Sequence, residues 1–280
     1  MSKGFLDGNR YLCLVAMLEK TPQEQFAANA SAILALDDQV IGLAVGGSWL
    51  TNDLDEFSDL DLVLVTETRI AGDTDRMMAY AARLGKFLSG FTGEHVGEPR
   101  LLICLYDEPL LHVDIKFLTL EEFYNRVETP TLLLDKGKRL SAALANSVAQ
   151  FPYPDFQWIE DRFWTWIHYA LLKIGRGEYL EACDFLGFLR MVVLGPLLHM
   201  KNGSLPRGVR KVETTLDPTD LNLLKQTIAS YDRQQLLKSL RRSVALYNQL
   251  RIALYGPAVK LQESTEQKVM SYFDFIEKRS

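Results

Sequence analysis

The stretch Ser58-Asp59-Leu60-Asp61-Leu62-Val63-Leu64-Val65 begins with alternating acidic and apolar residues and becomes wholly apolar. Successive side chains of a strand point to opposite faces, so Asp59 and Asp61 share one face and the leucines share the other. Two like charges at this spacing repel each other, and a bound divalent cation would relieve the repulsion. Carboxylate ligands without His or Cys favour Mg²⁺ over zinc.

A second strand with an acidic residue follows at His112-Val113-Asp114-Ile115-Lys116-Phe117. Its apolar residues face the core, whereas Asp114 faces away from the core together with His112 and Lys116. If this strand lies beside the first, Asp114 completes a group of three carboxylates. Three acids can hold two Mg²⁺ ions that bridge the phosphates of a nucleotide and stabilise a leaving pyrophosphate.

A glycine turn precedes both acidic strands. The apolar run 40–45 ends in Gly46-Gly47-Ser48, and a short helix is expected over 49–54. Glycines let backbone N–H groups approach a phosphate closely, a helix N-terminus adds a favourable dipole, and Ser48 adds a hydroxyl donor. The order of apolar strand, Gly-Gly-Ser, Ser-Asp-Leu-Asp-Leu and a later strand with one acid is far more specific than any of these signals alone.

The pattern of the chain changes at Phe151-Pro152-Tyr153-Pro154, where two prolines favour extended backbone. Before it, the sequence predicts strands at 40–45, 59–65, 101–106 and 111–117, with helices at 22–36 and 73–88. After it, helices are predicted at 156–174, 179–200, 219–230 and 233–255, with a loop at 206–217. We therefore predict an α+β protein in two domains, a mixed sheet with flanking helices over 1–150 and an all-α helical bundle over 151–280, with the site in the cleft between them.

Two details support the helices of the first domain. Thr21 can cap the helix that begins at Pro22, with Glu24 as its capping-box partner. The helix at 73–88 has one apolar face, made by Met77, Tyr80, Ala81 and Leu84.

Composition excludes several classes of protein. The formal charge of −5 argues against an extended nucleic-acid footprint, which needs clustered Lys and Arg. Cys13, Cys104 and Cys183 are widely spaced among apolar neighbours, so we expect reduced core thiols. The N-terminus lacks a signal-peptide pattern, and the most apolar stretch, 191–200, is too short to span a bilayer. We expect a cytoplasmic protein, monomeric or homodimeric, without a membrane or nucleic-acid partner.

These motifs resemble those of the DNA polymerase beta superfamily of nucleotidyltransferases. Gly47-Ser48 with Ser58-Asp59-Leu60-Asp61-Leu62 is similar to the superfamily's glycine-serine and paired-aspartate signature, and Asp114 is similar to its third carboxylate. Within this superfamily, the chain resembles bacterial aminoglycoside and lincosamide adenylyltransferases, which have a helical C-terminal domain. The resemblance covers about residues 40–140, including 132–137, and is weaker in the second half, where it rests on 173–178 and on the helical character.

The resemblance implies transfer of a nucleoside monophosphate, commonly AMP from ATP, to the hydroxyl of a small acceptor, with release of pyrophosphate. It implies that Asp59, Asp61 and Asp114 hold Mg²⁺, two ions when the nucleotide is bound. Gly47 and Ser48 would hold the triphosphate, and we add Ser58 and Lys173 as nucleotide-binding candidates.

The sequence departs from antibiotic-modifying relatives, several of which use an extra glutamate as general base. The predicted strand at 101–106 has no glutamate, and Tyr169 stands where one relative suggests an acid. Asp114 is then the candidate proton acceptor.

Three features of the second half allow two interpretations each. Lys173, followed by Arg176, can reach the triphosphate or simply favour a helix C-terminus. The loop 206–211 can cover phosphates or be solvated. The aromatic residues of one helix can stack on an acceptor ring or belong to the core; they are Trp158, Trp164, Trp166 and Tyr169.

Two other functions remain open. An antitoxin-like or AMPylating nucleotidyltransferase would act on a partner protein, and a stable partner or AMP on a protein side chain would reveal it. A glycosyltransferase using Asp-x-Asp would bind a sugar nucleotide with manganese, and it would need a larger nucleotide-binding domain than residues 40–140.

Overall fold

The computed structural model describes residues 20–279, and the chain divides between Phe151 and Pro152 into two compact units. Cys13, one of the three predicted reduced thiols, lies outside the described residues. Cys104 is buried, Cys183 is partly exposed, and both are free thiols. Each unit has its own apolar core.

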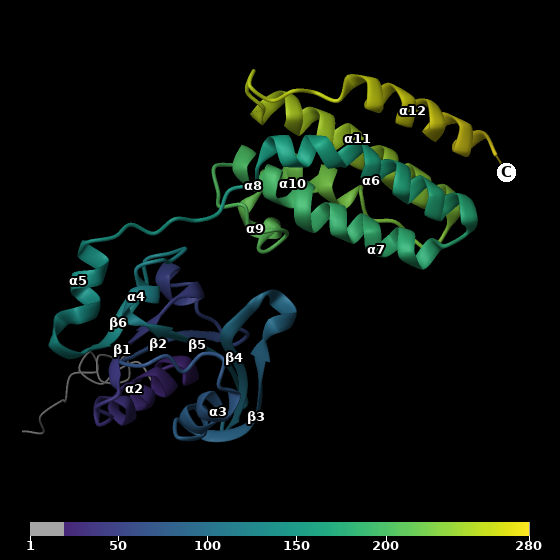
Figure 1. The fold of residues 1–280 in the computed structure, drawn as a ribbon. Coiled ribbons are helices and arrows are strands. Elements are labelled where there is room, and N and C mark those ends of the chain that lie inside the picture. The colour runs from purple at the N-terminus through teal and green to yellow at the C-terminus, as the bar shows by residue number, and fades with distance from the viewer. Residues whose placement is uncertain (1–19, 280) are drawn as a thin grey trace, which may run out of the picture. The chain divides into compact units, whose positions relative to one another are not determined.

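A six-stranded mixed sheet forms the centre of the first unit (Figure 1), which confirms the predicted fold class. The strands are β1 Val40–Val45, β2 Leu60–Thr66, β3 Lys86–Gly93, β4 Glu98–Asp107, β5 Leu111–Thr119 and β6 Thr131–Asp135. Their order is β3-β4-β5-β2-β1-β6. The two central strands, β2 and β5, pair in parallel, and all the other pairs are antiparallel.

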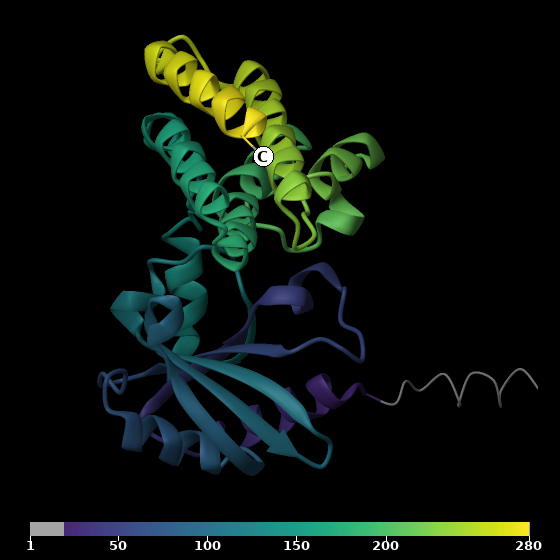
Figure 2. The same cartoon turned by 90° about the vertical axis from the view of Figure 1, so that its right-hand side faces the viewer.

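Helices α2 (Pro22–Ala35) and α3 (Thr74–Ala82) cover one face of this sheet (Figure 2). The predicted capping box is present, since Thr21 N donates to Glu24 Oε2 at 2.8 Å and Glu24 N donates to Thr21 Oγ1 at 3.2 Å. The apolar residues of β2 and β5 pack against these helices, which confirms the predicted alternation; Leu60, Leu62, Val113, Ile115 and Phe117 are all buried.

Helix α3 is shorter than predicted. It ends at Ala82, and the chain turns at Gly85 into β3, a strand that the sequence did not indicate. A Cβ on Gly85 would lie 3.2 Å from both Phe26 and Tyr106, so the turn packs closely on the core. Because β3 is an edge strand with half of its residues exposed and only one buried, it lacks the apolar alternation that marks buried strands.

Two short helices cover part of the opposite face. They are α4 (Leu120–Phe123) and α5 (Arg139–Ala145), and they pack on a small core that includes Val65 of β2 and Leu118 of β5. These residues lie toward the C-terminal ends of the two strands. The opposite, N-terminal ends of β2 and β5 carry Asp61 and Asp114 on this same face, outside that core.

The second unit is helical throughout, as predicted (Figure 1). Its elements are α6 Phe156–Arg176, α7 Tyr179–Leu189, the π-helical turn η4 Arg190–Leu194, α8 Gly195–Lys201, α9 Val212–Thr215, α10 Pro218–Lys225, α11 Arg233–Leu254 and α12 Glu263–Lys278. The helix predicted at 179–200 is thus interrupted by η4. The structure also adds α12, and α10 ends five residues before the predicted end of its helix.

A buried carboxylate joins three helices of this unit. Glu160 of α6 is fully buried and accepts hydrogen bonds from Tyr247 Oη at 2.5 Å, Arg251 Nη1 at 3.2 Å and Gln262 N at 2.9 Å. Burial, reinforced by the Glu160 hydrogen bond, raises the pKa of the Tyr247 hydroxyl. A buried charge with several partners is costly to disturb, so this network fixes α11 and the start of α12 on α6.

Within residues 20–279, one apolar helical segment, Tyr179–Lys201, could cross a membrane as judged by length and composition alone. Half of its most apolar window is buried inside the second unit. The segment contributes to the apolar core there and is a core segment in this fold; its core residues include Leu186, Leu189, Val193, Leu194, Leu197 and Leu198.

Candidate functional site

The predicted acids of β2 and β5 lie opposite each other. Asp61 and Asp114 are register partners in the parallel pair, and Gly46 N donates to Asp61 O at 2.9 Å on the other side of β2. Neighbouring strands lie about 4.8 Å apart, so the two carboxylates start from adjacent positions on one face. Gly46, which directly follows β1, thus forms a row with Asp61 of β2 and Asp114 of β5.

The glycine turn lies against this row. A short 3₁₀ helix, η1 (Gly47–Thr51), replaces the helix predicted at 49–54, and its C-cap residue, Asn52, lies in the left-handed region. Gly47 has φ +60°, and a Cβ there would lie 1.9 Å from Asp61 Oδ2. Only glycine lets the Asp61 carboxylate approach the backbone so closely. Ser48 follows as the second residue of η1, and it is half-buried.

The hydroxyl of Ser58, a predicted nucleotide ligand, takes part in the turn that leads to β2. Ser58 Oγ donates to Asp55 Oδ1 at 2.8 Å and accepts from Asp55 N at 3.0 Å. Gln23 of α2, which is buried, donates to the carbonyl oxygens of Ser58 at 2.8 Å and Asp55 at 3.1 Å. These bonds set the approach of the chain to Asp59, which lies one residue before β2.

Histidine and lysine neighbours complete the face around Asp114. His112 Nε2 lies 2.9 Å from Asp114 Oδ1, so the imidazole fixes one oxygen of that carboxylate. Lys116 Nζ lies 2.7 Å from Glu98 Oε2, and Arg100 Nε lies 2.7 Å from Glu98 Oε1. The hydrogen bond from Arg100, reinforced by Lys116, lowers the pKa of Glu98 to about 2. Lys116 is therefore balanced by a charged partner within the same face.

Glu128 is a carboxylate of this region that the sequence did not indicate. It lies in the loop between α4 and β6, and Gly47 N donates to its Oε1 at 2.8 Å. A Cβ on Gly46 would lie 2.5 Å from the same oxygen. No motif marks Glu128, and 81 residues separate it from Gly47 along the chain, so only the fold brings the two together.

The donor set fits a divalent ion of the magnesium type in part. Within residues 20–279, no group of three or more His, Cys, Asp or Glu side chains is placed to hold a metal ion, so the predicted group of three is not assembled as a closed cage. Mg²⁺ commonly uses one or two carboxylates and takes its remaining ligands from phosphates and water. Asp61 and Asp114 on adjacent strands match that requirement.

Lys173 belongs to the second unit, near the end of α6. Its ammonium lies 2.8 Å from Glu178 Oε2 and 3.0 Å from Glu181 Oε1, above the ring of Tyr169. The hydrogen bonds to these two glutamates raise the pKa of Lys173. The charge of Lys173 is thus balanced locally.

The predicted aromatic group divides between core and surface. Trp164 is buried against Phe163 and Tyr247 in the core. The other rings form a connected row on α6 and α7, with centroids 4.8 to 5.5 Å apart. The members of this row are Trp158, Trp166, Phe188, Phe185 and Tyr169.

The loop predicted at 206–211 packs on its own unit. Gly208 O lies so close to Gly195 of α8 that a Cβ on Gly195 would meet it at 2.2 Å. A glycine is therefore needed on the helix for the loop to reach this position.

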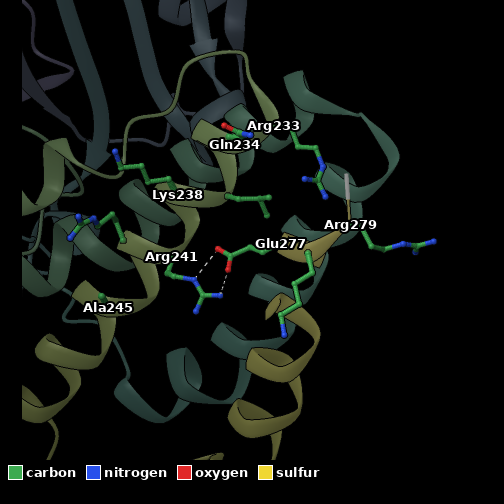
Figure 3. Close-up of a pocket in the computed structure, with 10 residues that line it drawn as sticks. Arg233, Gln234, Lys238, Arg241, Ala245, Glu277 and Arg279 are labelled. Atoms are coloured by element: carbon green, nitrogen blue, oxygen red, sulfur yellow. Dashed lines mark hydrogen bonds and ion pairs between the residues drawn. The ribbon is translucent and has the colours of Figure 1, made fainter. Parts of the chain in front are cut away.

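A surface groove of about 720 Å³ lies within the second unit, between α11 and the end of α12. Its lining is rich in arginine and lysine, but the charge of Arg241 is balanced by Glu277. Figure 3 shows Arg241 and Glu277 facing each other, with Arg241 Nη2 2.7 Å from Glu277 Oε2. Arg233 Nη2 donates to the carbonyl of Ile276 at 2.6 Å. None of the predicted site residues lines this groove.

No protein-family model matches the sequence, and no curated protein matches it. Among solved structures, the chain is similar to an aminoglycoside 6-adenyltransferase from Bacillus subtilis, with a TM-score of 0.41 and 17% identity over 92% of this chain and 99% of that chain. It is also similar to a nucleotidyltransferase-like protein from Exiguobacterium sibiricum 255-15, with a TM-score of 0.34 and 14% identity over 90% of this chain and 80% of that chain. The case for function rests on the geometry of the site.

Proposed function

We propose that the chain is a magnesium-dependent nucleotidyltransferase that transfers a nucleoside monophosphate, with AMP from ATP favoured, to the hydroxyl of a small acceptor. The observation that carries this proposal is the parallel register of β2 and β5, which sets Asp61 opposite Asp114. The Gly47 turn, which packs directly on Asp61, supports it. Acidic groups beside a glycine turn suit a substrate that combines phosphates with a divalent ion.

Each residue of the site has a proposed task. Asp61 and Asp114 hold Mg²⁺, with Asp59 as a further ligand when nucleotide is bound. The backbone N–H of Gly47 and the hydroxyl of Ser48 bind the triphosphate. Bound Mg²⁺ would offset the phosphate charge, including the charge that develops on the leaving pyrophosphate. Ser58 and Gln23 keep the chain before β2 in place, so Ser58 contributes through the turn as well as through any contact with the nucleotide.

The proposed reaction forms one bond and breaks one. The acceptor oxygen bonds to the α-phosphorus of the nucleotide, and the bond from that phosphorus to the oxygen bridging the α- and β-phosphates breaks. The electron pair of the broken bond leaves with pyrophosphate. The acceptor hydroxyl loses its proton to a carboxylate, for which we propose Asp114, with His112 holding that side chain in place.

We assign recognition of the acceptor to the helical unit over residues 151–280. Its row of aromatic rings offers surfaces on which a sugar or another ring can stack, because Trp158 and Tyr169 are about 40% exposed. Lys173 would serve the triphosphate only if its pairs with Glu178 and Glu181 open. An aminoglycoside is one acceptor to test within the class of small hydroxylated compounds.

Release of pyrophosphate from ATP, measured with Mg²⁺ across a panel of hydroxylated acceptors, tests the proposal. We expect Asp61→Asn and Asp114→Asn each to lower the rate by about 100-fold or more, as removal of a charge-stabilising group does. Asp38→Asn, an exposed carboxylate of the same unit, is the matched control and should leave the rate unchanged. Folded Asn variants that release pyrophosphate at the wild-type rate would contradict the assignment.

A further inference from the structure

The Glu128 carboxylate accepts a hydrogen bond from Gly47 N–H, the same donor that binds the triphosphate in the proposed function. Gly47 N donates to Glu128 Oε1 at 2.8 Å, and this oxygen also fills the space where a Cβ of Gly46 would lie. A carboxylate oxygen therefore rests directly on the Gly46–Gly47 backbone. It lies where a phosphate oxygen would lie if Gly47 N–H were to bind the triphosphate.

A backbone N–H has one hydrogen, so Glu128 and a phosphate compete for it. Both are anions, and their mutual repulsion makes simultaneous binding at neighbouring positions costly. Asp61 also packs on this glycine turn, which adds a further negative charge. A nucleotide must therefore displace the Glu128 carboxylate before it can use this donor.

A rotation of the Glu128 side chain would achieve this displacement. The loop is anchored two residues earlier, where Arg126 Nη2 donates to Ser147 O at 2.5 Å and Gln150 N donates to Arg126 O at 2.9 Å. The backbone at Arg126 can stay in place while the Glu128 side chain rotates about its own bonds. A surface pocket of about 470 Å³ adjoins this anchored segment, and Arg126 and Ser147 help to line it.

We propose that Glu128 determines nucleotide affinity: its carboxylate binds Gly47 N–H in the nucleotide-free protein, and the triphosphate displaces it. The inference rests on the proposed function, because it takes a triphosphate to be the ligand of the glycine turn. Glu128 then keeps the Gly47 N–H hydrogen-bonded when no nucleotide is present, and it weakens the binding of phosphates. The effect depends on phosphate charge, so the affinity for a nucleoside without phosphates should not depend on Glu128.

The test compares the wild type with Glu128→Ala and Glu128→Gln. Titration calorimetry gives the dissociation constants for ATP with Mg²⁺, for inorganic tripolyphosphate with Mg²⁺ and for adenosine. We expect Glu128→Ala to bind ATP and tripolyphosphate about 3- to 10-fold more tightly, as removal of one competing hydrogen bond predicts. Glu128→Gln keeps a neutral acceptor, so its affinity for ATP should lie between those of the wild type and Glu128→Ala. Adenosine affinity should not change.

Glu121→Gln is the matched control, because Glu121 is an exposed carboxylate in α4, seven residues earlier. Its removal should leave ATP affinity at the wild-type value. If ATP binds Glu128→Gln and Glu128→Ala no more tightly than it binds the wild type, Glu128 does not compete and the inference is overturned. If the adenosine affinity rises as much as the ATP affinity, the phosphate-specific mechanism is likewise overturned. If none of the folded proteins binds ATP or tripolyphosphate, the proposed function fails, and the inference fails with it.

Discussion

At the scale of single residues, the turn at Gly46 and Gly47 depends on the lack of a Cβ at both positions. Gly47 combines φ +60° with an Asp61 oxygen at the place of its Cβ, whereas Gly46 has an extended backbone and faces only the flexible end of Glu128. The two glycines are adjacent in sequence but differ in what a methyl group would meet. Their substitution therefore separates a backbone requirement from a simple lack of space.

We predict that Gly47→Ala lowers the free energy of unfolding by about 1–2 kcal/mol or more, because alanine is strained in the left-handed region and would push Asp61 aside. Gly46→Ala should cost clearly less, because Glu128 can rotate away. Urea unfolding of both variants measures the difference. Equal losses would show that the left-handed conformation of Gly47 is not needed.

Glu98 gives a prediction about pH. Its ion pairs with Arg100 and Lys116 lower its pKa from 4.5 to about 2. A carboxylate whose pKa is lower in the folded state stabilises the fold above its unfolded pKa, and this contribution falls as the pH drops toward the folded value. We expect Glu98→Gln to cost about 1–2 kcal/mol at pH 7 and progressively less between pH 5 and pH 3. A cost that stays constant over this range would argue against the ion pairs.

The sequence predicted some site residues and missed others for a physical reason. Strand alternation placed Asp61 and Asp114 on outward faces, and the structure makes them register partners. Gln23 and Glu128 act through contacts with residues 32 or more positions away, so no local pattern marks them. A helical glutamine and a loop glutamate are both ordinary at the surface of a protein.

At the scale of secondary structure, local signals worked where an element is buried on one side. Strands β1, β2 and β5 follow their predicted ranges closely because apolar runs or alternation identify them. The edge strand β3 has half of its residues exposed, and its first three residues, 86–88, were predicted as the end of a helix. The short helix η1 begins two residues earlier in the chain than predicted, because its first residue is the left-handed Gly47 and not a helix former.

Helix α2 gives a prediction at this scale, because Gln23 fastens the turn before β2 to that helix. Gln23→Ala would leave the carbonyls of Asp55 and Ser58 without this donor, so we expect a loss of about 1–3 kcal/mol in unfolding free energy. The pyrophosphate-release rate should also fall, because the turn leads directly to Asp59. Gln25→Ala, an exposed glutamine on the same helix, should change neither quantity. The same loss in both variants would show that the contact with the turn is unimportant.

At the scale of the whole molecule, the change from mixed periodicity to helical periodicity was enough to predict a sheet followed by a helical bundle. The bundle's internal detail was less accessible, because η4 and the loop position at Gly208 depend on packing between helices. The buried Glu160 also interrupts the apolar pattern of α6. Its hydrogen-bond partners Tyr247 and Arg251 are distant in sequence, so no local pattern predicts its burial.

The second unit has its own core, so we predict that residues 152–280 fold without the sheet unit. Circular dichroism of this fragment should show a helical spectrum and a cooperative thermal transition. Glu160→Ala should lower its midpoint, because four hydrogen-bond donors would lose their buried partner. A fragment with no cooperative transition would mean that its core needs the first unit.

The central claim is that Asp61 and Asp114 share a divalent ion with a bound nucleotide. Electron paramagnetic resonance of Mn²⁺, used in place of Mg²⁺ with a non-hydrolysable ATP analogue, measures this binding without requiring an acceptor. We predict that the analogue creates a bound Mn²⁺ population in the wild type, and that Asp61→Asn and Asp114→Asn each weaken Mn²⁺ binding by about 10-fold or more while the proteins stay folded. Equal Mn²⁺ binding by the wild type and both variants would contradict the account.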